Sequence, residues 1–154
     1  MIDPQEFRTL VIKPVLAHLG TKYATKEAVD ILLATALAES NLSHLKQVHG
    51  PALGLYQMEW ATFDDLQLSF LRYHPKLAEK FARCFFPAVP WLTQFPSNLW
   101  AQTAAARLQY WRDSKPLPTE PEAMAEYYLR VWNTPAGKAT LSKVLWAFRK
   151  AVEY

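Results

Sequence analysis

The sequence has few of the features that would indicate a disulfide framework, a membrane span or a nucleic-acid-binding arm. Its single cysteine, Cys84, excludes an intramolecular disulfide, and the apolar residues around it predict an inert, packed thiol. No apolar run approaches the roughly 18 residues that a membrane span needs. Lys and Arg are scattered among 14 acidic residues, so the formal charge of +3 only weakly indicates a nucleic-acid partner and suits an anionic wall polymer equally well. We therefore expect neither a membrane nor nucleic acid as a partner.

The composition is that of a folded domain. Apolar residues make up 51% of the 154 residues and charged residues 20%, which favours one compact domain over residues 1–154. The first ten residues, MIDPQEFRTL, carry acids where a signal peptide would carry bases. We therefore expect synthesis in the cytosol without a signal peptide. A target outside the cytosol would then be reached by another route, such as a virion or holin pores.

Helical periodicity separated by turns favours an all-α fold, or an α-rich fold with a very short β segment near residues 52–58. Asp3, which precedes Pro4, and Thr25 are predicted to cap the first two helices. Pro14 should kink or interrupt the first helix.

Capping residues and prolines after residue 60 predict where the later helices begin. Helices are predicted to begin at Thr62 and Pro75, and Ser97 is predicted to cap a third. The segment from Trp91 to Pro96 is expected to be irregular. A final helix should follow the turn that ends at Gly137.

One stretch, residues 39–59 (ESNLSHLKQVHGPALGLYQME), combines the features of a saccharide site. Glu39 ends an apolar helix, where the helix dipole and the apolar flanks both disfavour the ionised carboxylate. We therefore predict a raised pKa, which suits a general acid at neutral pH. From periodicity alone, a solvated Glu that merely ends a helix is the commoner interpretation. After it, small residues let the backbone approach a ligand, and Tyr56, Gln57 and Glu59 supply an aromatic ring, an amide and a second carboxylate.

This stretch resembles the soluble lytic transglycosylases and the goose-type lysozymes of the lysozyme-like superfamily. Their signature is a Glu-Ser pair followed by a Gly-Ala-x-Gly-Leu-x-Gln turn; here Glu39-Ser40 is followed by Pro51-Ala52-Leu53-Gly54-Leu55-Tyr56-Gln57. Gln57 follows Glu39 by 18 residues, a spacing typical of the transglycosylases. The resemblance runs from about residue 30 to 138, is loose after its first third, and includes Asn98 and the segment 132–137 (WNTPAG). The sequence GLYQME also resembles lytic or tail-associated proteins of bacteriophages.

The resemblance implies a lysozyme-like fold and a muramidase that cleaves the MurNAc-GlcNAc β-1,4 bond of bacterial peptidoglycan. Glu39 would be the catalytic acid. The residues implied to bind substrate are Ser40, Tyr56, Gln57, Tyr127, Tyr128 and Asn133.

Two departures bear on the mechanism. The family Ser that would support the catalytic Glu is Val48 here. Glu59 lies where goose-type lysozymes have a second carboxylate, so it is the candidate base for a hydrolase, which needs an activated water. A transglycosylase needs only Glu39, so both outcomes are left open. Asp64 and Asp65 are interpreted as charges in the first turn of a helix.

Other interpretations are weaker. His44 and His49 lack the spacing of a zinc site, and no metal or cofactor is predicted. Core packing is the default for each Trp, with Trp91 or Trp132 as a candidate for stacking on sugar. A glycan-binding or structural phage tail module without catalysis is the alternative function, and Val48 favours it. The oligomeric state is left open.

Overall fold

The computed structural model describes residues 1–133 and 137–154, and within them the protein is helical and contains no sheet. This confirms the predicted all-α class. The α-helices are α1 (Pro4–Glu6), α2 (Lys13–Leu19), α3 (Lys26–Ser40), α4 (Trp60–Ser69), α5 (Pro75–Ala82), α6 (Trp91–Gln94), α7 (Leu99–Trp111), α8 (Pro121–Tyr128) and α9 (Leu141–Ala151). The π-helices are η1 (Phe7–Ile12) and η5 (Leu129–Asn133), and the 3-10 turns are η2 (Thr21–Tyr23), η3 (Leu71–Tyr73) and η4 (Phe95–Ser97).

The first helical segment begins where the sequence predicts, and a π-helix precedes Pro14. Asp3 Oδ1 accepts a hydrogen bond of 2.9 Å from the N–H of Glu6, so Asp3 is the N-cap. Pro14 has no N–H to donate to the turn before it, and that turn widens into the π-helix η1 instead of breaking. The segment then ends at Leu19, and Gly20 follows.

Helix α3 is the centre of the fold. Thr25 Oγ1 caps it by accepting a hydrogen bond of 3.2 Å from the N–H of Ala28. Its side chains are buried from Ala28 to Leu37, and it packs most extensively against α9. A single cluster of buried apolar side chains extends through the chain, with members in most of the helices. The position of Glu39 is thus fixed by a helix that is buried along most of its length.

Two helix boundaries predicted from the sequence are wrong. Helix α4 begins at Trp60, because the carbonyl of Glu59 already accepts hydrogen bonds from the N–H groups of Thr62 and Phe63. The cap of α7 is Asn98, whose Oδ1 accepts a hydrogen bond of 2.9 Å from Ala101 N–H. Side-chain capping depends on rotamers that flanking sequence does not fix.

The segment expected to be irregular, residues 91–96, forms the short helix α6 and the start of η4. Buried Gln94 holds the preceding loop in place. Its Oε1 accepts a hydrogen bond from Phe86 N–H, and its Nε2 donates to the carbonyls of Phe86 and Val89. This organisation depends on contacts eight residues apart, which periodicity does not report.

The predicted β segment consists of isolated bridges. Leu53 pairs with both Lys46 and Met58. Gly54 turns the chain between these bridges with φ +77°, and a Cβ on it would lie 2.4 Å from the side chain of Gln102. Gln102 Oε1 accepts a hydrogen bond of 2.8 Å from Leu55 N–H, so helix α7 holds this turn directly.

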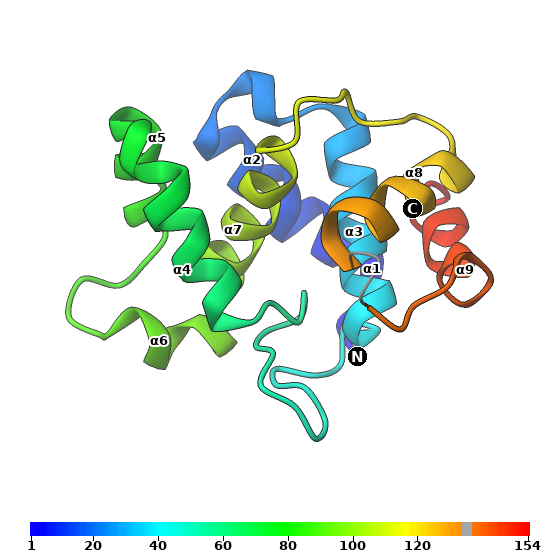
Figure 1. Ribbon diagram of the computed structural model, residues 1–154, viewed down its shortest axis with the longest axis horizontal. Coiled ribbons are helices and arrows are strands. Elements are labelled where there is room, and N and C mark those ends of the chain that lie inside the picture. Colours follow the sequence, from blue (N-terminus) through cyan, green and yellow to red (C-terminus); the bar gives the residue numbers. More distant parts are fainter. Residues whose placement is uncertain (134–136) are drawn as a thin grey trace.

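Figure 1 shows how these elements are arranged. Helices α4, α5 and α6 lie on one side and α8 and α9 on the other, with α3 and α7 between them. The segment between α3 and α4 loops out at the bottom of the view. In the part of the chain that is described, no helix combines the length and apolarity required to cross a membrane. Helix α8 contacts α3, and η5 passes in front of α3 in this view.

Candidate active site

A cleft of about 540 Å³ lies where the end of α3, the segment 41–59, the start of α4 and η5 meet. This volume is within the range of small-molecule sites. Its walls carry amides and carboxylates along with a few apolar side chains. They are formed by Glu39, His44, Gln47, Val48, Ala52, Gln57, Met58, Glu59, Thr62, Gln109, Trp132 and Asn133.

Glu39 is the most buried carboxyl group in this cleft. Tyr128 O–H donates a hydrogen bond of 2.6 Å to its Oε1, joining the end of α3 to α8. Burial raises the pKa of Glu39 above its ordinary value, and this effect exceeds the lowering by hydrogen bonds from Tyr128 and Trp132. The raised pKa predicted from the sequence is confirmed in direction. The site therefore holds a carboxyl group whose proton is retained to higher pH than usual.

The π-helix η5 brings two further groups to the cleft. Trp132 lines it and stacks on buried Tyr110, with ring centroids 5.3 Å apart and an interplanar angle of 28°. Asn133 lines it as well, as the resemblance implied. Its Oδ1 is buried and has no hydrogen-bond partner among the described residues. Residues 134–136, part of the WNTPAG segment in the resemblance, lie outside the described residues.

Gln57 also belongs to the wall of the cleft. Its backbone has φ +52°, which is unusual for a residue other than glycine. Its Nε2 donates a hydrogen bond of 2.9 Å to the carbonyl of Gly54. Within the described residues the amide oxygen of Gln57 accepts no hydrogen bond, so it is available as an acceptor in the cleft.

Two of the residues predicted to contact substrate are part of the core instead. Ser40 is buried, and its Oγ donates a hydrogen bond of 2.7 Å to the carbonyl of Leu55. Tyr56 is only 1% exposed, and its hydroxyl lies 3.2 Å from Thr103 Oγ1. Neither lines the cleft. Their contacts fix the distance between Glu39 and the Gln57 turn, so we assign them a structural role.

Tyr127 is also misplaced by the sequence-based prediction. Its hydroxyl donates a hydrogen bond of 3.0 Å to Asp113 Oδ2, on the side of α8 away from the cleft. Adjacent residues on a helix point about 100° apart, so only one of Tyr127 and Tyr128 can face Glu39. The structure places Tyr128 there.

Glu59 and Val48 both line the cleft and are exposed. No hydrogen bond to the Glu59 carboxylate is formed within the described ranges, in contrast to Glu39. Asp65 lies on α4 beyond its first turn, and it pairs with Arg112 at 2.9 Å. Neither Asp64 nor Asp65 lines the cleft. Because α4 begins at Trp60, both residues lie beyond its first turn, so their predicted place in that turn is wrong.

Sequence reasoning missed part of the wall. Gln109 comes from α7 and Thr62 from α4, whereas Gln47 and Met58 lie within residues 39–59 but were not assigned a role in the site. His44, which was considered from the sequence only as a metal ligand, also lines the cleft. No sequence pattern indicates Gln109, because only packing of α7 against α4 brings it there.

Across the described residues, no group of three His, Cys, Asp or Glu side chains is arranged to hold a metal ion. Cys84 is buried, and burial raises its pKa to about 11, which confirms the prediction of a packed thiol. No protein-family model, curated protein or solved structure matches this chain.

Proposed function

We propose that the protein is a peptidoglycan-degrading muramidase that cleaves the MurNAc-GlcNAc β-1,4 bond, with Glu39 as the general acid. One observation carries this proposal: a largely buried carboxyl group with a raised pKa lies in a ligand-sized cleft and is held by Tyr128. The resemblance of residues 39–57 to lytic transglycosylases and goose-type lysozymes supports it, and a lysozyme-like fold is part of the proposal. Bacterial wall glycan is then the partner, and delivery from a virion or through holin pores would bring the enzyme to it.

The cleft offers the groups that a sugar chain requires. Gln47, Gln57 and Gln109 carry amides that can bond sugar hydroxyls, and Trp132 offers a ring. Such walls bind neutral sugar rings better than they would bind a flat apolar ligand. This composition supports a glycan as the ligand of the cleft.

Transglycosylation is the form of cleavage that the site supports best. The Glu39 carboxyl would protonate the glycosidic oxygen, so the bond from that oxygen to C1 of MurNAc breaks. The resulting carboxylate would then take the proton from the 6-hydroxyl of the same MurNAc while that oxygen bonds to C1, closing a 1,6-anhydro ring. Water is not consumed, and Glu39 ends protonated.

Hydrolysis is the second form of cleavage, with Glu59 as the base. An inverting hydrolase places its second carboxylate to activate water, at roughly 6.5–9.5 Å from the acid. Glu59 lies on the cleft wall, which favours this role. It is exposed, however, and no described hydrogen bond orients its carboxylate, whereas a general base has to be held in place. For this reason we place transglycosylation first.

A glycan-binding or structural module without catalysis, such as a phage tail component, is the second candidate function. Val48 favours it, because an exposed apolar side chain lines the cleft where the family has a Ser. In that case the cleft would hold glycan and release no fragments.

Digestion of purified peptidoglycan tests these candidates. We expect fragments with 1,6-anhydro-MurNAc ends by mass spectrometry, and none from the Glu39→Gln variant, which keeps the shape of the side chain but removes the proton. Reducing ends would instead indicate hydrolysis. If the wild-type protein pulls down with peptidoglycan but releases no fragments, the non-catalytic candidate is correct.

A further inference from the structure

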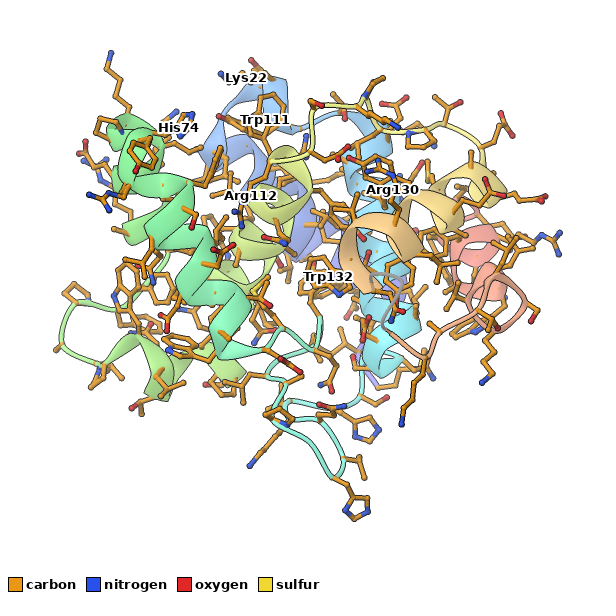
Figure 2. All side chains as sticks on the ribbon, viewed as in Figure 1. Lys22, His74, Trp111, Arg112, Arg130 and Trp132 are labelled. Atoms are coloured by element: carbon orange, nitrogen blue, oxygen red, sulfur yellow. The ribbon has the colours of Figure 1, made fainter. Side chains whose placement is uncertain are left out.

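A second cavity, of about 510 Å³, lies away from the cleft, between the beginning of α3, the end of α7 and the loop that follows α7. It shares no lining residue with the cleft. Figure 2 shows two of its residues, Lys22 and Trp111, close together at the top of the molecule, whereas Trp132 of the cleft lies well below them. A function of this cavity would thus be separate from the proposed catalysis in the cleft.

The wall of this cavity contains a buried guanidinium group. Arg107 is 3% exposed, and its Nε donates a hydrogen bond of 2.9 Å to the carbonyl of Tyr23. In residues 1–133 and 137–154 no carboxylate forms an ion pair with it. Its two terminal nitrogens have no hydrogen-bond partner within these ranges, yet they are not sealed from solvent and so border the cavity. The group retains unused donors in a fork that fits an oxyanion.

The contacts of Arg107 compensate only part of the cost of burying a charge. Its Cζ lies 5.2 Å from the centre of the Trp111 ring, a cation–π distance. Burial lowers its pKa to about 10, which shows that its cationic form is less stable than in water. Buried charges in proteins are generally paired, so a missing counter-charge is informative.

The other charges at the cavity leave room for an anion. Lys22 and Lys115 line it and are exposed. Of its two carboxylates, Asp113 is already bound by both terminal nitrogens of Arg130, at 2.9 and 3.1 Å, and by Tyr127 O–H. Glu27, the second carboxylate, forms no ion pair with Arg107 among the described residues. The uncompensated charge on this wall is therefore positive.

We propose that this cavity binds an organic oxyanion, a carboxylate or phosphate group attached to an apolar or aromatic body. The oxyanion receives hydrogen bonds from the free terminal nitrogens of Arg107, and Lys22 and Lys115 attract it from the rim. The body lies against the side chains of Trp111 and Leu117, which line the same cavity. Arg107 thereby gains the counter-charge that the described chain does not supply.

Three small probes of matched size test this site. We would titrate the wild-type protein with phenyl phosphate, benzoate and uncharged benzamide, following calorimetry and the NMR signal of the Arg107 side-chain N–H. We expect saturable binding of at least one anion and a shift of that signal, with benzamide at least about tenfold weaker because the charge-assisted bonds are missing. Comparing the two anions identifies which oxyanion is preferred.

Two variants, one in α7 and one at its C-cap, provide the matched comparison. Arg107→Met keeps most of the side-chain volume, and we expect it to weaken anion binding at least about tenfold. Arg112→Met removes a positive charge from the C-cap of α7, outside the cavity, and binding should stay within about twofold. Should Arg107→Met fail to fold, the double variant Lys22→Met and Lys115→Met alters only exposed groups and should weaken binding about threefold or more. The proposal is overturned if neither anion binds the wild-type protein saturably, or if binding survives unchanged in whichever of these pocket variants folds.

Discussion

The hydroxyl of Tyr128 donates a hydrogen bond of 2.6 Å to Glu39 Oε1, across 89 positions of the sequence. This bond acts on the site in two ways. It orients the carboxyl group, and it stabilises the carboxylate that remains after a proton has been donated. Burial acts in the opposite direction on the pKa and has the larger effect. The balance between them sets the pH at which Glu39 gives up its proton.

Tyr128→Phe should therefore move the pH dependence of wall lysis. Losing the hydrogen bond removes a cause that lowers the pKa of Glu39, so that pKa rises further. A general acid is active while protonated, so the loss of activity on raising pH should shift to higher pH. The maximal rate should fall about tenfold or more because the carboxylate left by proton transfer is less stable. The rate of fragment release measured across a pH series checks both effects.

Tyr127→Phe is the matched control for this experiment. It removes a hydroxyl from the neighbouring residue, but that hydroxyl bonds to Asp113 and not to the cleft. We expect the pH profile to be that of the wild-type protein. An equal shift in both variants would contradict the role assigned to Tyr128.

Glu39→Gln should change how stability depends on pH. The pKa of Glu39 is raised in the folded protein from an ordinary value of 4.5. The folded state therefore holds this proton more tightly than the unfolded state, so its stabilising effect is complete below the ordinary pKa and is lost as pH rises through the folded pKa. Gln has no proton to lose. We expect similar urea midpoints for both proteins at about pH 4 and a higher midpoint for Glu39→Gln at neutral pH. A constant difference at all pH values would contradict a raised pKa.

The sequence predicted where the site lies in the chain better than it predicted which side chains line the cleft. Glu39 and Gln57 lie in one continuous motif, and local signals located it at the end of an apolar helix and in the turn that follows. The partner Tyr128 and its neighbour Tyr127 were both candidates, because the sequence does not fix the rotation of α8 about its axis. Ser40 and Tyr56 point into the core for a similar reason: burial is decided by what packs on the motif from α7. Arg107 gave no signal, since an Arg within a helix is normally solvated.

Glu59→Gln distinguishes the two ways of breaking the bond. If Glu39 performs both proton transfers, the exposed Glu59 carboxylate is not required, and we expect fragment release to stay within about threefold of the wild-type rate. A general base contributes roughly 10²–10⁴-fold, so a loss of that size would assign hydrolysis to the site. The rate and the ratio of anhydro to reducing ends should be measured on the same digests. Together they show whether water enters the product.

Gly54→Ala should destabilise the cleft wall. Gly54 has φ +77°, and a Cβ on it would lie 2.4 Å from Gln102 Cδ, a side chain fixed by hydrogen bonds to the carbonyls of Phe95 and Pro96. Strain and the clash together should lower the free energy of unfolding by about 2–4 kcal/mol. Gly50→Ala is the control, because its φ is not positive and its nearest neighbour, the Gln47 side chain, can rotate away. Urea denaturation compares the two, and equal effects would contradict this account.

Arg8→Met should be among the most destabilising substitutions outside the cleft. Arg8 Nη1 lies 2.7 Å from Asp30 Oδ1, and Asp30 is 1% exposed within α3. Removing Arg8 leaves a buried carboxylate with only Lys26 as its partner, which should cost about 3–5 kcal/mol. The pair of Arg83 and Glu79 has the same chemistry on an exposed surface, so Arg83→Met should cost less than about 0.5 kcal/mol. Chemical denaturation of both variants at neutral pH measures the difference. Equal losses of stability in the two variants would contradict the claim that the burial of Asp30 makes its ion pair with Arg8 important.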